Sequence, residues 1–229
     1  MAQQINTDKD CETLQTCLQK LWDWSQLWGM KFNADKCHIL HMGKNNPSHK
    51  YTLGGVQLEA TEEEKDIGVL ISKNLKPTKQ CERAARTANG VLSQILRAFS
   101  YRDKVILPRI YKTYVRPHLE FAAPAWNPWL RGDIDKLEKV QKRLVSSVQG
   151  LRGHTYEEKL TEIGLDSLED RRIKLDLIQT FKTTRMTETE RKRIRIELLP
   201  VGTTRLTQGG WSLAKSQSQL EVRSKFFSQ

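Results

Sequence analysis

The chain has 229 residues, and its 38 lysines and arginines outnumber 27 aspartates and glutamates to give a formal charge of +11. A charged fraction of 28% excludes a membrane protein, and six tryptophans, five tyrosines and six phenylalanines argue against a wholly disordered chain. We therefore expect a basic, soluble and at least partly folded protein with room for one or two domains.

The positive charge is concentrated in the middle of the sequence. Residues 1–70 carry a net charge of −3, residues 71–150 carry +10, and residues 151–229 carry +4. A concentrated positive field favours a polyanionic partner, because neutralised phosphates release their counterions when the complex forms. The alternative is that these lysines and arginines are simply solvated.

The cysteines and the N-terminus favour an intracellular protein, in the nucleus or the cytoplasm. The four cysteines follow neither a disulfide framework nor a paired-ligand spacing, and the first ten residues lack a hydrophobic signal core. No run of about 18 apolar residues is present to span a membrane. Cys37, His38 and His41 are close enough in sequence for a zinc site, but no second ligand pair accompanies them, so we assign them to a half-buried strand and expect no metal.

The first third predicts one helix followed by short strands. Apolar residues at helical spacing and acidic residues near the start indicate a helix between residues 6 and 29. A turn at residues 31–36 precedes a strand candidate at residues 37–42, and Gly54-Gly55 predicts a two-residue hairpin. Residues 62–64 are expected to form an acidic loop, and residues 67–71 (IGVLI) a buried strand.

From residue 77 the pattern becomes that of an amphipathic helix. Its apolar face consists of Cys81, Ala84, Ala85, Ala88, Val91, Leu92, Ile95, Leu96 and Phe99. The opposite face carries what we call the basic stripe, Lys79, Arg83, Arg86 and Arg97, with the small residues Gly90 and Ser93 between the cations. A surface helix normally mixes both signs of charge, whereas this purely basic stripe lets a sugar–phosphate backbone approach. It predicts nucleic-acid contact, with a solvated helix face as the alternative.

Helical patterns continue to about residue 185. A helix is expected over residues 104–115, which Pro108 either opens or kinks. Three later prolines, Pro117, Pro124 and Pro128, predict an irregular segment in which Trp126 and Trp129 are core anchors rather than base-stacking platforms. Further helices are expected over residues 133–150, 156–163 and 167–183, the first with its cations Lys136, Lys139, Lys142 and Arg143 on the outer side.

These elements predict an α+β fold that is mostly helical, with a small antiparallel β remnant in the N-terminal third. The expected domains are residues 1–75, residues 76–185 and a basic, weakly ordered extension over residues 186–229, which contains the run RKRIR at 191–195. The strands of the first domain lack neighbours, so their edges are expected to be open.

Several segments, in this order, resemble the reverse transcriptase of LINE-type non-LTR retrotransposons of the chicken-repeat and jockey-like group. Residues 28–37 (WGMKFNADKC) are similar to the end of the palm, and residues 65–69 (KDIGV) to the strand that grips the primer. Residues 110–121 (IYKTYVRPHLEF) with 126–128 (WNP) resemble the segment after the first thumb helix. Residues 133–134, 137–143 (LEKVQKR) and 167–172 (SLEDRR) continue the pattern, and residues 212–229 resemble part of a C-terminal extension.

The resemblance implies RNA-directed DNA polymerase activity for the parent protein and places residues of this chain around the template–primer duplex. Lys36 would be a proton donor to the leaving pyrophosphate, and Asp66, Ile67 and Gly68 would hold the primer end through their backbone. Lys79, Arg83, Arg86 and Arg97 would follow the phosphates of the RNA or DNA duplex. An exposed lysine, a core strand and a solvated face are the respective alternatives.

Polymerase chemistry also needs aspartates that hold two Mg²⁺ ions, and in this family they precede the equivalent of residue 1. This sequence contains no Asp-Asp pair, and Asp133 with Asp135 looks like a helix start rather than a metal site. We therefore expect a fragment, the end of the palm with the thumb, that has no catalytic residue of its own and no cofactor. Fingers and catalytic palm would be its missing partners, and its oligomeric state is open.

Two alternatives to this duplex-binding fragment remain. One is a non-catalytic relic that binds RNA, DNA or a protein through its basic helices and through exposed tryptophans around Trp22, Trp24 and Trp28. The other is an open reading frame without selected function.

Overall fold

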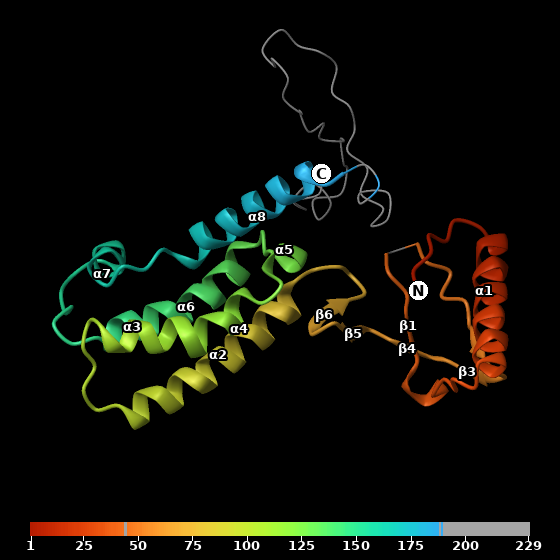
Figure 1. Cartoon of the computed structure of the whole chain (residues 1–229), viewed down its shortest axis with the longest axis horizontal. Helices are drawn as coiled ribbons and strands as arrows, with labels where there is room; N and C mark the ends of the chain where they lie inside the picture. Colours follow the sequence, from red (N-terminus) through yellow and green to blue (C-terminus); the bar gives the residue numbers. More distant parts are fainter. Residues whose placement is uncertain (44, 188, 190–229) are drawn as a thin grey trace, which may run out of the picture. The chain divides into compact units, whose positions relative to one another are not determined.

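The computed structural model describes residues 1–43, 45–187 and 189, and the chain divides into two compact units, residues 1–79 and residues from 80 onward (Figure 1). The fold is α+β and mostly helical, as expected from the sequence. The expected basic extension, including residues 191–195, falls almost entirely outside the described residues. None of the helices in the described ranges is both long and apolar enough to cross a bilayer.

Helix α1 (Asp8–Leu27) forms the N-terminal helix that the spacing predicts. Thr7 precedes it, and the backbone N–H and hydroxyl of Thr7 donate hydrogen bonds to one oxygen of Asp10 at 2.8 and 2.9 Å. This carboxylate also accepts the N–H of Asn6 at 3.0 Å. Because these donors favour the charged form, the pKa of Asp10 lies below its usual value, with the Asn6 bond as the largest cause.

The strands of the first unit pair in twos. A short 3-10 turn, η1 (Ala34–Lys36), leads into β1 (His38–Leu40), which pairs in parallel with β4 (Glu59–Thr61). Strands β2 (Thr52–Leu53) and β3 (Val56–Gln57) form the predicted hairpin around Gly54-Gly55, whose φ angles are +60° and +82°. The β remnant is therefore antiparallel except for one parallel pair.

Helix α1 packs on the β2–β3 hairpin through a polar contact and a close approach. The amide of Gln15 accepts the N–H of Thr52 at 2.9 Å and donates to the Thr52 carbonyl at 3.1 Å. The indole of Trp22 lies directly over Gly54, where a Cβ atom would collide with the ring. Glycine at this turn is thus required both by the positive φ and by the tryptophan above it.

The prediction for residues 62–71 is wrong in part. Strand β5 (Glu63–Asp66) replaces most of the acidic loop, and it pairs antiparallel with β6 (Val69–Ser72). Ile67 and Gly68 are not in a buried strand: they form the two-residue turn between β5 and β6, with φ of +45° and +87°, and Ile67 is 87% exposed. Positive φ at both central residues is the requirement of a type I′ hairpin turn. The hydrophobic sequence of residues 67–71 does not indicate a turn at its first two residues.

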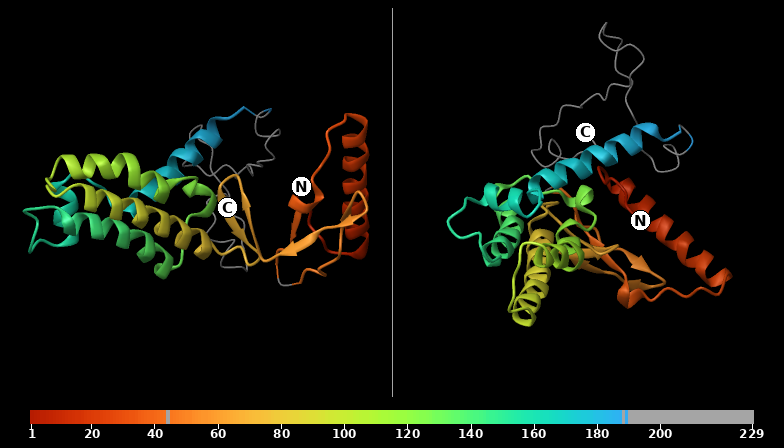
Figure 2. Two further views of the ribbon diagram at one scale, coloured as in Figure 1. Left: turned by 90° about the horizontal axis from the view of Figure 1, so that it is seen from below. Right: turned by 60° about the vertical axis from the view of Figure 1, so that its left-hand side comes forward.

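The second unit is a bundle of helices around one apolar core. Its long helices are α2 (Thr78–Ala98), α6 (Arg131–Ser147) and α8 (Leu168–Arg185), with the short helices α5 (Ala123–Trp126) and α7 (Tyr156–Glu162) between them. A helical rod made of α3 (Ile106–Ile110), η2 (Tyr111–Val115) and α4 (Arg116–Glu120) completes the unit (Figure 2). The fully buried centre includes Leu92, Leu107, Val115, Leu119, Leu137, Val140 and Leu144.

The rod α3–η2–α4 corrects the expectation that Pro117 begins an irregular segment. Pro108 lies near the start of α3, but Pro117 lies inside the continuing helical path, at the first turn of α4. The preceding turn, η2, is a π-helix, and the changed hydrogen-bond register there accommodates a residue that has no N–H to donate. The irregular path begins only after Glu120, and Trp126 is buried there, with its indole N–H on the carbonyl of Phe121 at 2.8 Å.

A buried polar network joins the rod to α6 and α7. Gln141 accepts the Tyr111 hydroxyl proton at 2.7 Å and donates to the Tyr156 hydroxyl at 3.1 Å and to the Asp166 carbonyl at 2.9 Å. The Tyr156 hydroxyl in turn donates to Glu138 at 2.5 Å. Burial and this carboxylate raise the pKa of Tyr156, so the phenol stays protonated and remains a donor.

Candidate nucleic-acid interface

Helix α2 separates its cations from the core along its whole length. Cys81, Ala84, Ala88, Leu92 and Ile95 are buried on the face that the sequence predicts. The basic stripe lies on the other side, because spacings of four, three and eleven residues correspond to near-whole helical turns. From Lys79 to Arg97 the stripe extends for about 27 Å at 1.5 Å per residue.

The cations of the stripe differ in their surroundings. Lys79, Arg86 and Arg97 are exposed, and among the described residues no acidic side chain forms an ion pair with any of them. Arg83 is half-buried and has an interaction partner of its own. Gly90 is exposed, with open space where a side chain would be. Three cations and a gap between them therefore face the solvent.

Helix α6 runs beside α2 and adds a further cation to this surface. The Arg143 guanidinium donates to the Ser93 hydroxyl of α2 at 2.9 Å and lies 3.4 Å from the Asn89 amide oxygen. Arg143 is exposed and thus lies along the edge of the basic stripe. We call the stripe together with Arg143 the basic face.

The acidic residues of α2 and α6 form ion pairs or hydrogen bonds with residues outside the basic stripe. Lys136 donates to Glu82 at 2.9 Å and to Asp133 at 3.1 Å, and these bonds raise the pKa of its ammonium group, Glu82 being the larger cause. Asp135 pairs with Arg131 at 3.3 Å, and Glu138 is buried beside Tyr156. The basic face therefore keeps its positive charge, as a phosphate-binding surface requires.

The three residues of the primer-grip-like segment lie at the tip of the β5–β6 hairpin in the first unit. Asp66 is the last residue of β5, and Ile67 and Gly68 are the turn. A β-branched residue with positive φ is strained, and strained turns cluster at functional sites. The isoleucine side chain projects into solvent rather than into the core.

Lys36, the expected proton donor, ends the 3-10 turn η1 and is exposed. The turn is held by Asn33, whose side chain accepts the N–H of Asp35 at 3.1 Å. The neighbouring Cys37 donates its thiol to the Asn33 carbonyl at 3.3 Å, and His38 lies 3.2 Å from Glu64. These contacts hold the turn and the strand that follows.

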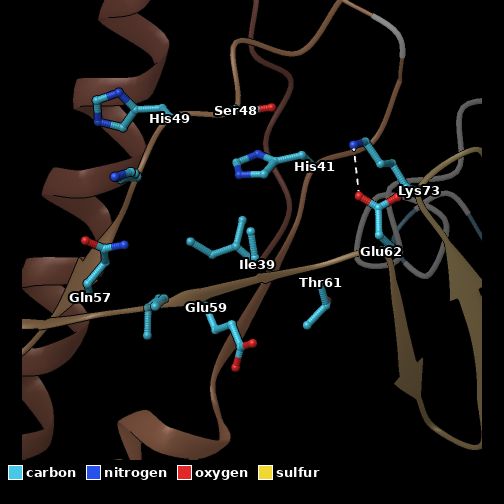
Figure 3. Close-up of a pocket in the computed structure, with 12 residues that line it drawn as sticks. Ile39, His41, Ser48, His49, Gln57, Glu59, Thr61, Glu62 and Lys73 are labelled. Atoms are coloured by element: carbon cyan, nitrogen blue, oxygen red, sulfur yellow. Dashed lines mark hydrogen bonds and ion pairs between the residues drawn. The ribbon is translucent and has the colours of Figure 1, made fainter.

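A cavity of about 330 Å³ lies over the parallel pair β1–β4 in the first unit (Figure 3). Alternation along the strands turns Ile39 and His41 toward it, whereas Glu59 and Thr61 point to the other side. At its edge Lys73 pairs with Glu62 at 3.1 Å, so that lysine is already neutralised.

The described residues contain no group of three or more histidine, cysteine, aspartate or glutamate side chains that would hold a metal ion. Asp133 and Asp135, which imitate an aspartate pair in the sequence, bind Lys136 and Arg131 instead.

The comparisons with known proteins give a distant relation. No protein-family model and no solved structure match the chain. It is 25% identical over 146 residues to the RNA-directed DNA polymerase from mobile element jockey of Drosophila funebris, which covers 61% of this chain and 16% of that protein. An uncharacterized protein of Caenorhabditis elegans is 24% identical over 119 residues, 51% of this chain and 60% of the relative. The chain thus spans less than two thirds of either relative, and the similarity supports a reverse-transcriptase-like relation to part of a mobile-element polymerase.

Proposed function

We propose that this chain is the duplex-binding part of a retrotransposon RNA-directed DNA polymerase, and that it binds the RNA or DNA template–primer duplex through the basic face. The observation that carries the proposal is the arrangement of Lys79, Arg86 and Arg97: three exposed cations on one line, with neighbouring acids already paired elsewhere. The distant similarity to the jockey polymerase supports the same class of partner.

The basic face suits recognition of the backbone rather than of bases. Lysine and arginine contacts to phosphates fix the position of a duplex without reading its sequence. The open space at Gly90 allows a strand to approach the helix closely. Binding is therefore expected to depend on duplex shape and salt, and little on base sequence.

In this proposal the Mg²⁺-dependent chemistry belongs to residues outside the chain. The purified chain is expected to bind a primed template but not to extend it. Lys36 and the segment Asp66, Ile67 and Gly68 would act only within the complete polymerase, as proton donor and primer contact.

The test is duplex binding after charge reversal, measured by fluorescence anisotropy with a labelled RNA–DNA hybrid. Lys79→Glu with Arg86→Glu removes two phosphate contacts and should weaken binding more than 10-fold. The matched control is Lys20→Glu with Lys31→Glu, two exposed lysines of the first unit, which changes the net charge equally. Equal losses for the two double variants would reduce the basic face to a solvated surface and would overturn the proposal.

A further inference from the structure

After Leu168, which is fully buried at its start, helix α8 turns polar residues inward and several apolar residues outward. The inward line includes Arg172, which is only 2% exposed, followed by Asp176 and the buried Thr183. A surface helix normally shows the reverse arrangement. An outward apolar face of this kind marks a site of contact with another molecule.

The outward face has a regular apolar stripe, which consists of Ile173, Leu177 and Phe181. Their exposed fractions are 52%, 64% and 55%, and they follow each other at intervals of four residues. The α8 stripe is thus about 12 Å long, with Leu177 at its centre. In Figures 1 and 2 the C-terminal half of α8 projects beyond the other described helices of its unit.

Opposite charges lie at similar distances on the two sides of Leu177. Asp170 lies seven residues before Leu177, and Arg185 lies eight residues after it. The Asp170 carboxylate accepts the Ser167 hydroxyl at 2.7 Å but has no ion pair among the described residues. The Arg185 guanidinium lies 4.5 Å from the centre of the Phe181 ring, at the end of the α8 stripe.

This pattern is complementary to itself when one helix is reversed. In an antiparallel pair centred on Leu177, Ile173 packs on Phe181 of the second copy, and Asp170 meets its Arg185. A parallel pair would instead bring like charges together. Self-complementarity of one patch is the requirement of a two-fold symmetric dimer.

We propose that the α8 stripe binds the α8 helix of a second copy of this chain, antiparallel about a two-fold axis at Leu177. The interface uses none of the residues of the basic face, so it does not depend on the proposed function. The dimer can therefore be tested in the absence of nucleic acid, and its failure would leave duplex binding untouched.

The first test is sedimentation equilibrium of the full chain over a range of concentrations, with Leu177→Glu as the disrupting variant. The wild-type chain should associate as a dimer. Leu177→Glu places two carboxylates at the two-fold axis and should raise the dissociation constant at least about 100-fold, as for the loss of a central interface residue in each copy. The matched control, Val105→Glu at an exposed apolar position of another element, should leave the constant unchanged.

The second test separates the orientations. Asp170→Arg and Arg185→Asp should each weaken an antiparallel dimer, and the double variant should restore it. The proposal would be overturned if Leu177→Glu left the dissociation constant of the dimer unchanged, or if the double variant did not restore it. A monomer at all concentrations whose unfolding midpoint falls with Leu177→Glu would also overturn it, because the α8 stripe would then be covered by the chain's own residues from 190 onward.

Discussion

At the residue scale, Gly54 joins a turn requirement to a packing requirement. Gly54→Ala should lower the free energy of unfolding of the first unit by about 2–4 kcal/mol. The cost arises because alanine would have to adopt a positive φ and because its Cβ atom would collide with the Trp22 ring. Gly55→Ala, also at positive φ but with open space around it, should cost only about 1–2 kcal/mol. Urea unfolding followed by tryptophan fluorescence measures both. Equal losses would mean that Trp22 moves aside freely.

At Ile67, by contrast, the residue type does not suit the backbone conformation, because a β-branched residue has a positive φ. Ile67→Asn should stabilise the β5–β6 hairpin by about 1 kcal/mol, because asparagine before glycine accepts the positive φ angles of this turn. The measurement is the urea midpoint of the variant against wild type. A gain in stability would support the strain at this turn, whereas a loss of stability would contradict it.

At the element scale, α8 is anchored by a buried cation. Burial lowers the pKa of Arg172, two of its guanidinium nitrogens lack a partner among the described residues, and the carboxylate of Glu138 is its main electrostatic counterpart. Arg172→Met should leave the buried carboxylate of Glu138 without its nearby positive charge and should cost about 3–5 kcal/mol in unfolding free energy. Chemical denaturation checks this, with Arg109→Met at an exposed position as the control. A stability equal to that of wild type would show that the cation is dispensable.

The start of α1 supplies a pH-dependent prediction. The folded state holds the pKa of Asp10 below its unfolded value, so its contribution to stability is present above the unfolded pKa and is lost as pH falls through the folded pKa. Asp10→Asn removes the charge that the Asn6 and Thr7 donors favour. Wild type and variant should therefore differ at neutral pH and begin to converge as the pH falls below about 4, with the difference lost below the folded pKa. A difference that grows on acidification in thermal unfolding scans would contradict the cap.

Periodicity predicts the regular elements of this chain well. The helices at α1, α2, α6, α7 and α8 and the Gly54-Gly55 hairpin follow from local spacing and turn chemistry, and the α+β class is confirmed. The sequence does not predict strand β5, because Glu63–Asp66 consists only of charged residues, most of them exposed, on a two-stranded hairpin. The parallel pairing of β1 with β4 joins residues about twenty apart, a contact that no local pattern specifies.

Part of the candidate site is predictable from the sequence and part of it arises only from helix packing. The cationic side of α2 follows from its own sequence, because the buried residues opposite it define the face. The position of Arg143 against Ser93 and the pairing of Lys136 with Glu82 arise from helix packing, which a single helix pattern does not contain. In α8 periodicity alone would bury the Ile173 side, whereas the structure buries the opposite side, which carries Arg172.

At the scale of the whole molecule, positive charge on one surface is the property on which the proposed duplex binding depends. Helices α2 and α6 carry the basic face, and the acids beside it are held by Lys136 and Arg131. Binding driven by counterion release falls steeply with salt, whereas apolar association such as the α8 contact is weakened little. The two activities can therefore be separated by ionic strength alone, and raising salt should abolish duplex binding before it dissociates the dimer.

The salt dependence of duplex affinity is the sharpest test of phosphate binding by the basic face. We expect log K for an RNA–DNA hybrid to fall linearly with log salt concentration, and the slope to be smaller by about 2 in the Lys79→Glu, Arg86→Glu variant. An unchanged slope in that variant would contradict duplex binding by the basic face, because the phosphates would then be neutralised by other residues.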